Sequence, residues 1–120
     1  MSKAQTHQGG CHCGAVRYEV ELSLDSVISC NCSICSKRGH WLAFAPASHF
    51  HLLSGENEAL AEYRFNSHRI GHTFCRTCGI GAFGRGAMPD GTPTVAINVR
   101  CLDGIDLDAI QPVAYDGRSR

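Results

Sequence analysis

Seven of the eight cysteines in this 120-residue sequence lie in three tight clusters. The clusters are a C-x-C, a C-x-C-x-x-C and a C-x-x-C, formed by Cys11 and Cys13, by Cys30, Cys32 and Cys35, and by Cys75 and Cys78. Thiols one or two residues apart can converge on one soft cation, so this spacing is typical of metal ligands. Two sites with four cysteine ligands each would need eight clustered thiols. We therefore expect one site closed by four thiolates and a second site with three thiolates and an exchangeable position.

Disulfide bonds are the main alternative for these cysteines, because their number is even and the chain is short. The N-terminal sequence MSKAQTHQGG contains no apolar segment of the kind that directs secretion, so we expect a cytoplasmic protein. Disulfides are rare in that compartment. A C-x-x-C motif in an intracellular chain more often indicates metal or redox chemistry, and we interpret the clusters as metal sites.

In the closed site we expect four cysteine ligands: Cys11, Cys13, Cys75 and Cys78. Residues i and i+2 of a strand point to the same side, so Cys11 and Cys13 can reach one ion. Cys75 and Cys78, followed by Gly79, are typical of a zinc knuckle, where the glycine lets the chain reverse and N–H groups face the thiolates. Four thiolates leave no room for a substrate, so this zinc would be structural. Another pairing of the motifs, or a redox role for either C-x-x-C, stays open, although redox pairs usually open a helix in a βαβ unit.

In the open site we expect three cysteine ligands: Cys30, Cys32 and Cys35. Three protein ligands and one exchangeable position are the arrangement of a catalytic zinc. An incoming thiol suits that position, because zinc favours sulfur and a coordinated thiol loses its proton. The alternative is a second structural zinc, completed by one of four other residues: His40, His68, His72 or Cys101.

Basic residues beside the open site could bind an anionic substrate. Lys37 and Arg38 directly follow the three cysteines and could hold a carboxylate of the thiol, although solvated charge is the alternative for both. Arg85, between two glycines, could also contact an anion. Cys101 stands alone beside an apolar strand and is expected to be a buried, inert thiol.

Short strands must position these residues. Residues 15–22 alternate in polarity, with Val16, Tyr18, Val20 and Leu22 on one side, which predicts a half-buried strand. Further short strands are predicted over 27–30, 41–45, 50–55, 60–65, 68–74, 80–84, 94–100 and 112–116. Helix is limited to single turns near 33–38, 46–49 and 106–110. Many short strands separated by turn residues predict an antiparallel all-β domain with small α content.

Length and composition predict one domain, with tails over residues 1–8 and 117–120 and a folded unit over 9–116. No stretch is apolar over 18 residues, so no membrane span is expected. Lys and Arg number 11, as do Asp and Glu, so the formal net charge is zero and the basic surface of a nucleic-acid binder is absent from the composition. A core of this size makes a structural metal plausible as a source of stability.

The clusters and their flanking residues resemble those of the glutathione-dependent formaldehyde-activating enzyme family, which includes centromere protein V. The segments that carry the resemblance are GGCHCGAVRYEV, CNCSICSKRG, YRF, FCRTCGIGAFGRG and VAINVRCLDGID, and they extend over most of the chain. The resemblance implies a small β-rich "tent" centred on zinc. It implies a structural zinc on Cys11, Cys13, Cys75 and Cys78, and a catalytic zinc on Cys30, Cys32 and Cys35.

The activity that the resemblance implies is carbon–sulfur bond formation or cleavage. Glutathione and formaldehyde combine reversibly to S-hydroxymethylglutathione, so the expected partners are a small thiol and a small aldehyde, with two Zn²⁺ per chain. The hypothesis is a carbon–sulfur lyase. The main alternative is a non-catalytic zinc scaffold that binds a protein partner, since the same fold occurs in such proteins. A zinc ribbon that binds nucleic acid is a third reading, which the charge balance disfavours.

Overall fold

A computed structural model of the chain describes residues 4–56, 59–64 and 70–116. The described part is mostly β, with 47% strand and 12% helix, and its two sheets are not closed into a barrel. The prediction of a mostly β fold with little helix is therefore confirmed. No helix among the described residues is both long enough and apolar enough to cross a membrane.

The smaller sheet has three antiparallel strands in the order β1 (Gln5–Gly10), β2 (Arg17–Leu22) and β5 (Phe50–Ser54). The prediction of a tail over residues 1–8 is wrong for residues 5–8, because they pair with β2 from Gln5 opposite Leu22 onward. The first four residues of β1 carry polar side chains that are mostly exposed, so the strand forms through its backbone hydrogen bonds. No apolar alternation in this segment could have predicted it. The predicted C-terminal tail, 117–120, lies outside the described residues.

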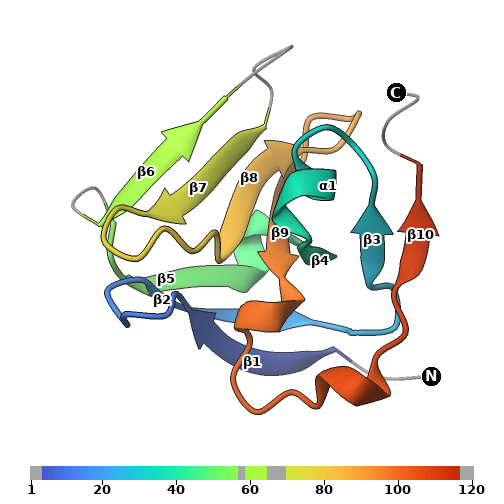
Figure 1. The fold of residues 1–120 in the computed structure, drawn as a ribbon, viewed down its shortest axis with the longest axis horizontal. Coiled ribbons are helices and arrows are strands. Elements are labelled where there is room, and N and C mark those ends of the chain that lie inside the picture. The colour runs from blue at the N-terminus through green and yellow to red at the C-terminus, as the bar shows by residue number, and fades with distance from the viewer. Residues whose placement is uncertain (1–3, 57–58, 65–69, 117–120) are drawn as a thin grey trace.

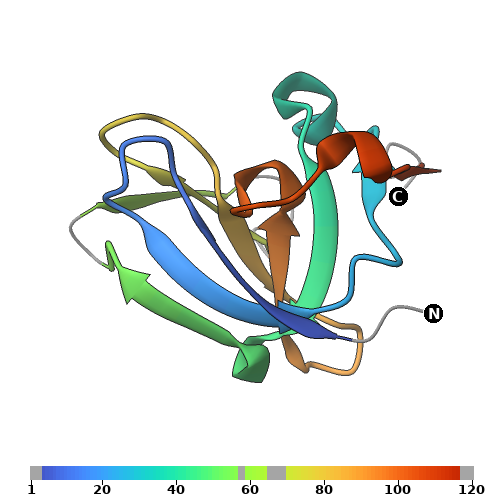
Figure 2. The ribbon, with the colours of Figure 1, turned by 90° about the horizontal axis from the view of Figure 1, so that it is seen from below.

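The larger sheet has seven strands, and Figure 1 shows it spread above the smaller one. In spatial order the strands are β10 (Val113–Tyr115), β3 (Ile28–Cys30), β4 (Trp41–Pro46), β9 (Pro93–Asn98), β8 (Phe83–Ala87), β7 (Gly71–Cys75) and β6 (Leu60–Tyr63). Figure 2, seen from below, shows the three-stranded sheet crossing in front of the larger one.

One strand pair departs from the predicted antiparallel arrangement, because β10 runs parallel to β3. A long connection leads from β9 to β10 through two 3-10 turns, η2 (Val99–Cys101) and η3 (Leu107–Ala109). This length lets the chain re-enter the sheet at the same end as β3. The N–H of Val113 donates to Val27 O at 2.9 Å, and the N–H of Asn31 donates to Tyr115 O at 3.1 Å.

The predicted helical turns near 33–38, 46–49 and 106–110 are confirmed as α1 (Cys35–Arg38), η1 (Ala47–His49) and η3. The strand predicted over 80–84 begins only at Phe83, because residues 79–82 complete the turn after β7. The strand predicted over 94–100 ends at Asn98, whose side chain accepts a hydrogen bond from the N–H of Arg100 and caps η2. The predicted strand over 68–74 is observed from Gly71; residues 65–69 lie outside the described part.

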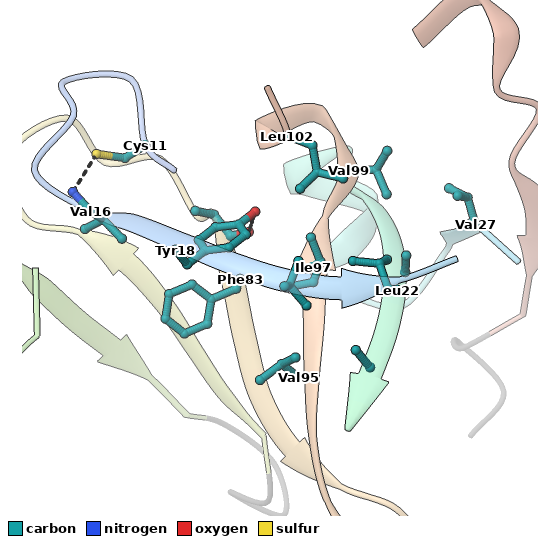
Figure 3. Close-up of a cluster of buried hydrophobic side chains, with 14 of the residues drawn as sticks. Cys11, Val16, Tyr18, Leu22, Val27, Phe83, Val95, Ile97, Val99 and Leu102 are labelled. Atoms are coloured by element: carbon teal, nitrogen blue, oxygen red, sulfur yellow. Dashed lines mark hydrogen bonds between the residues drawn. The ribbon is translucent and has the colours of Figure 1, made fainter. Parts of the chain in front are cut away.

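The core fills the space between the two sheets (Figure 3). Val16, Tyr18, Val20 and Leu22 are all buried, which confirms the predicted alternation along β2. The Tyr18 and Phe83 ring centroids lie 5.8 Å apart in an edge-on contact, and those of Phe50 and Phe83 lie 4.7 Å apart, so two aromatic pairs join the sheets. The Tyr18 hydroxyl donates to Ala82 O at 3.4 Å, next to the turn that carries the last cysteine pair.

Candidate functional site

The structure brings four cysteines from the two distant motifs into one group. The sulfur atoms of Cys11, Cys13, Cys75 and Cys78 all lie within 4.8 Å of one another. Cys13 Sγ is 3.6 Å from both Cys11 Sγ and Cys75 Sγ. The first pair lies in the loop between β1 and β2, rather than on a strand as predicted, because β1 ends at Gly10. We call this group the four-cysteine cluster.

Backbone N–H groups point at the sulfurs of the four-cysteine cluster. The N–H of Val16 donates to Cys11 Sγ at 3.3 Å, a contact drawn in Figure 3, and the N–H of Thr77 donates to Cys75 Sγ at 3.4 Å. Hydrogen bonds from the N–H groups of Cys13, Ile80 and His12 lower the pKa of Cys78 to about 6. Such donors stabilise thiolates, which are the form that binds a metal.

The turn after β7 has the geometry that the C-x-x-C-G pattern predicts. Gly79 has φ of +80°, a left-handed conformation that other residues rarely adopt. Its N–H donates to Cys75 O at 2.9 Å and closes the turn between the two cysteines. The sequence prediction for this motif is therefore confirmed in its backbone geometry.

A second group contains Cys30, Cys32 and Cys35, whose sulfur atoms also lie within 4.8 Å of one another. Cys30 ends β3, Cys32 lies in the following turn, and Cys35 begins α1. The N–H of Cys32 donates to Cys30 Sγ at 3.4 Å. Burial opposes ionisation of Cys32, but hydrogen bonds from Cys35, Cys30 and the N–H of Ile34 outweigh it and lower its pKa. We call this group the cysteine triad.

None of the other described histidines, cysteines or acidic residues joins the cysteine triad as a fourth ligand. His40, His72 and Cys101 all fall outside the group of converging atoms, and His68 lies outside the described residues. Cys101 Sγ instead accepts a hydrogen bond from Asn98 Nδ2 at 3.3 Å, and burial raises its pKa to about 11. The raised pKa agrees with the inert thiol expected at Cys101, but the residue is partly rather than fully buried.

The cysteine triad opens into a cavity of about 210 Å³. We call it the apolar cavity, because its walls are mainly aliphatic and aromatic, including Leu42, Phe44, Ile70, Phe83, Ala96 and Tyr115. Two imidazoles also face it. Burial, with the charge of Arg38 nearby, lowers the pKa of His40 to about 4, and the same causes lower that of His72. Both side chains are therefore mainly neutral at pH 7.

A second, more open cavity of about 480 Å³ adjoins the apolar cavity. Three residues line both cavities and so lie between them: Arg38, His40 and Asn98. The second cavity is rich in basic groups and contains Arg17 and Arg100; we call it the basic cavity. Arg17 forms an ion pair with Asp103, whereas Arg100 stacks over the Trp41 ring at 4.3 Å.

The two basic residues predicted to bind the substrate separate in the structure. Arg38 is half-buried between the cavities, whereas the adjacent Lys37 is exposed and is not a lining residue of either. Arg85 does not line the apolar cavity. It lines a separate polar pocket, and its guanidinium lies 5.3 Å from the Phe83 ring centroid.

Asn98 is a polar lining residue that the sequence pattern did not lead us to expect at the site. It is buried, and its side-chain amide donates to Gly81 O at 3.0 Å as well as to Cys101. The signal was present, because an asparagine inside the apolar segment VAINV must find buried partners. The apolar lining residues had no such signal, because any strand carries residues of this kind.

The fold and the site define a class of protein: a small, mostly β domain with two cysteine clusters. Each cluster could hold a metal such as zinc. The sequence matches the family described as "Glutathione-dependent formaldehyde-activating enzyme" over residues 6–116, and the chain belongs to this family. A crystal structure of a Rhodobacter sphaeroides protein is similar, with 34% sequence identity and a TM-score of 0.79. The match covers 90% of this chain and 98% of that one.

Proposed function

We propose that this protein is a zinc-dependent carbon–sulfur lyase that joins a thiol, with glutathione as the reference substrate, to formaldehyde or a similar small aldehyde. The observation that carries the proposal is the cysteine triad, which converges at the wall of a cavity with no fourth described ligand beside it. Membership of the family supports glutathione-dependent formaldehyde activation in general.

The donor atoms of both clusters suit zinc. Four thiolates around one point match a structural zinc site, and three thiolates match a site that keeps one position for an exchangeable ligand. We assign the first role to the four-cysteine cluster and the second to the cysteine triad. When bound at the triad, zinc would supply a Lewis acid that lowers the pKa of a thiol offered to its open position.

The residues around the triad would bind and orient the two reactants. Arg38 lies where it can hold a carboxylate of an anionic thiol while the sulfur enters the apolar cavity. The apolar walls exclude water and keep sulfur and carbonyl together, which supplies the proximity that accelerates a two-substrate addition. The sulfur forms a bond to the carbonyl carbon, the carbonyl π pair moves to oxygen, and the oxygen takes a proton. A neutral imidazole, that of His40 or His72, can donate a hydrogen bond to this oxygen.

The experiment that tests the proposal is metal analysis of the triple variant C30S/C32S/C35S, combined with a glutathione titration and a formaldehyde turnover assay. We expect the variant to lose one zinc per chain, thiol binding and turnover while its circular dichroism spectrum stays native. Cys101→Ser is the matched control, and it should retain both metals and turnover. Full turnover in the triple variant would show that the triad is not the catalytic centre. Global unfolding of the variant would instead favour a structural role, as a non-catalytic zinc scaffold requires.

A further inference from the structure

We infer that the carbonyl substrate carries an apolar substituent of about four to six carbons, which the apolar cavity holds beside the cysteine triad. The inference rests on the proposed function, and it assigns a longer aldehyde than formaldehyde as the preferred carbonyl substrate. Its basis is the shape, composition and exposure of the sheet face that forms the cavity.

The floor of the apolar cavity is the outer face of the larger sheet. Phe44 pairs with Ala96, Ala96 with Gly84, and Gly84 with His72, so one row of lining residues crosses four neighbouring strands. The neighbouring positions on β4 and β9 point the other way into the core, where Ala43, Ala45, Val95 and Ile97 are buried. Because side chains alternate along a strand, this row of lining residues occupies the face opposite the core.

An antiparallel sheet with only one face in a core usually carries polar residues on its other face. Here Leu42 and Phe44, two positions apart on β4, both line the cavity on that outer face. Their apolar character has no role in packing the two sheets together. A surface that keeps apolar residues away from the core is typical of a ligand site.

Large apolar side chains also remain exposed around this cavity. Phe44 and Ile70 are each 51% exposed and Tyr115 is 39% exposed, and all three line it. They come from β4, from the residue before β7 and from β10, so three separate segments of the chain contribute exposed apolar side chains to the lining. Binding of an apolar substituent would remove their surface from water, which is the main favourable term for such a ligand.

The charges of the apolar cavity also favour an uncharged substituent. No described aspartate or glutamate lines it, and outside the cysteine triad the one charged side chain among the lining residues is Arg38, at its boundary with the basic cavity. The imidazoles of His40 and His72 face it in their neutral form. A charged or strongly hydrated substituent would lose water there without gaining a partner.

The apolar cavity is larger than formaldehyde alone would fill. An apolar cavity of about 150 Å³ can hold a benzene molecule. The present cavity of about 210 Å³ therefore has room for a carbonyl group with an alkyl chain or ring of similar size beside the thiol sulfur. Formaldehyde, with two heavy atoms, would leave most of that space empty.

The chemistry is the same addition as for formaldehyde. The thiol sulfur forms a bond to the aldehyde carbon, the carbonyl π pair moves to oxygen, and the proton given up by the thiol is balanced by one that the oxygen gains. The product is a hemithioacetal, and the substituent is unchanged. No oxidant, reductant or further reactant is required.

The first test compares straight-chain aldehydes from acetaldehyde to octanal with glutathione and the zinc-loaded protein. The comparison stays within alkyl aldehydes, because their carbonyl carbons have similar reactivity. We expect kcat/KM to rise about fourfold for each added methylene, equivalent to about 0.8 kcal/mol, and to level off near hexanal when the cavity is full. A flat or falling series would overturn the inference, while triad-dependent turnover of formaldehyde would leave the proposed function standing.

The second test measures equilibrium binding of unreactive alcohols, ethanol to hexanol, by NMR chemical-shift titration. Affinity should rise with chain length, and the shifts should centre on Phe44 and Ile70. Phe44→Ser should flatten this dependence, whereas Leu53→Ser, at an equally exposed leucine outside the cavity lining, should leave it unchanged. Equal behaviour of the two variants would contradict the inference.

A third arm exchanges the roles of the reactants. Formaldehyde is offered with alkyl thiols of increasing length in place of glutathione. If chain length on the thiol raises kcat/KM and chain length on the aldehyde does not, the cavity serves the thiol and the inference is wrong. The reverse result supports it.

Discussion

Arg38 and Lys37 are neighbours in the sequence, yet only Arg38 turns toward the site. Both residues belong to α1, whose single turn presents them in different directions. Arg38 lines both cavities, and Lys37 is exposed. A sequence pattern can place both charges near the cysteine triad, but the turn of the backbone decides which one can reach a bound anion.

Arg38→Met is predicted to raise the KM for glutathione about tenfold or more, because a charge-assisted hydrogen bond contributes about 1.5–3 kcal/mol. Lys37→Met is the matched control, since it removes the same charge one residue away, and its KM should stay within about twofold because an exposed charge is weakly coupled. Steady-state kinetics at fixed aldehyde concentration make the comparison. Equal effects of the two substitutions would exclude the specific role of Arg38.

His40 is predicted to stay neutral down to about pH 5, because burial and the charge of Arg38 lower its pKa to about 4. Removing the positive charge with Arg38→Met should raise this pKa, and continued burial should keep it below the ordinary value of about 6.5. An NMR titration of the histidine ring protons measures both values. A native pKa near the ordinary value, or a fall in the variant, would contradict this account of the site.

The segment between β7 and β8 leaves room for the Arg38 side chain at Gly81. A Cβ atom at Gly81 would overlap the guanidinium of Arg38 and would lie 2.9 Å from Cε1 of His40. The absence of a side chain at Gly81 therefore leaves space for both side chains where they line the two cavities. The preceding knuckle anchors this segment through Cys75 and Cys78.

Gly81→Ala is predicted to displace Arg38 without changing any charge, and thus to raise the KM for glutathione about tenfold, as expected for loss of the same charge-assisted contact. Gly86→Ala on β8 is the control, since its nearest contact would be Ile70 at an ordinary 3.7 Å. Its KM for glutathione should remain near that of the unsubstituted protein. The idea fails if Gly81→Ala has native kinetics.

Elements with a local pattern were predictable, and elements that depend on distant partners were not. The alternation of β2 and the turn residues around α1 and η1 are local signals, and the structure has these elements where expected. β1 is polar along most of its length and exists because β2 offers it a partner. The parallel direction of β10 follows from the path of the whole connection after β9, which no local pattern contains.

At the scale of the molecule, the four-cysteine cluster joins the first hairpin, β1–β2, to the β7–β8 turn. These parts belong to different sheets, so the cluster acts as a cross-link across the core. The cysteine triad lies instead within one local segment, between β3 and α1. The grouping of the motifs could be proposed from spacing and resemblance. The apolar cavity could not, because its floor depends on the register of four strands.

Because the four-cysteine cluster joins two sheets and the cysteine triad lies within one local segment, we predict that substitutions in the two groups have unequal effects on the free energy of unfolding. Cys13→Ser should lower the free energy of unfolding of the zinc-loaded protein by about 3 kcal/mol or more. The reason is that the free energy of metal binding at a cross-linking site contributes directly to the stability of the folded state. Cys32→Ser should lower it by about 1 kcal/mol or less, since its site closes only a local turn. Urea unfolding followed by circular dichroism measures both. A larger loss for Cys32→Ser would reverse the assignment of structural and catalytic sites.

The proposed function requires an exchangeable position at the cysteine triad, whereas the four-cysteine cluster must be closed by its own thiolates. Cadmium NMR of the protein loaded at both clusters, recorded with and without saturating glutathione, tests this most directly. We predict two signals, of which the one lost in Cys35→Ser shifts on thiol addition toward the position typical of four sulfur ligands, while the other does not move. The proposed exchangeable position would be contradicted if the triad signal did not shift on addition of the thiol. It would also be contradicted if that signal already indicated four sulfur ligands in the absence of the thiol.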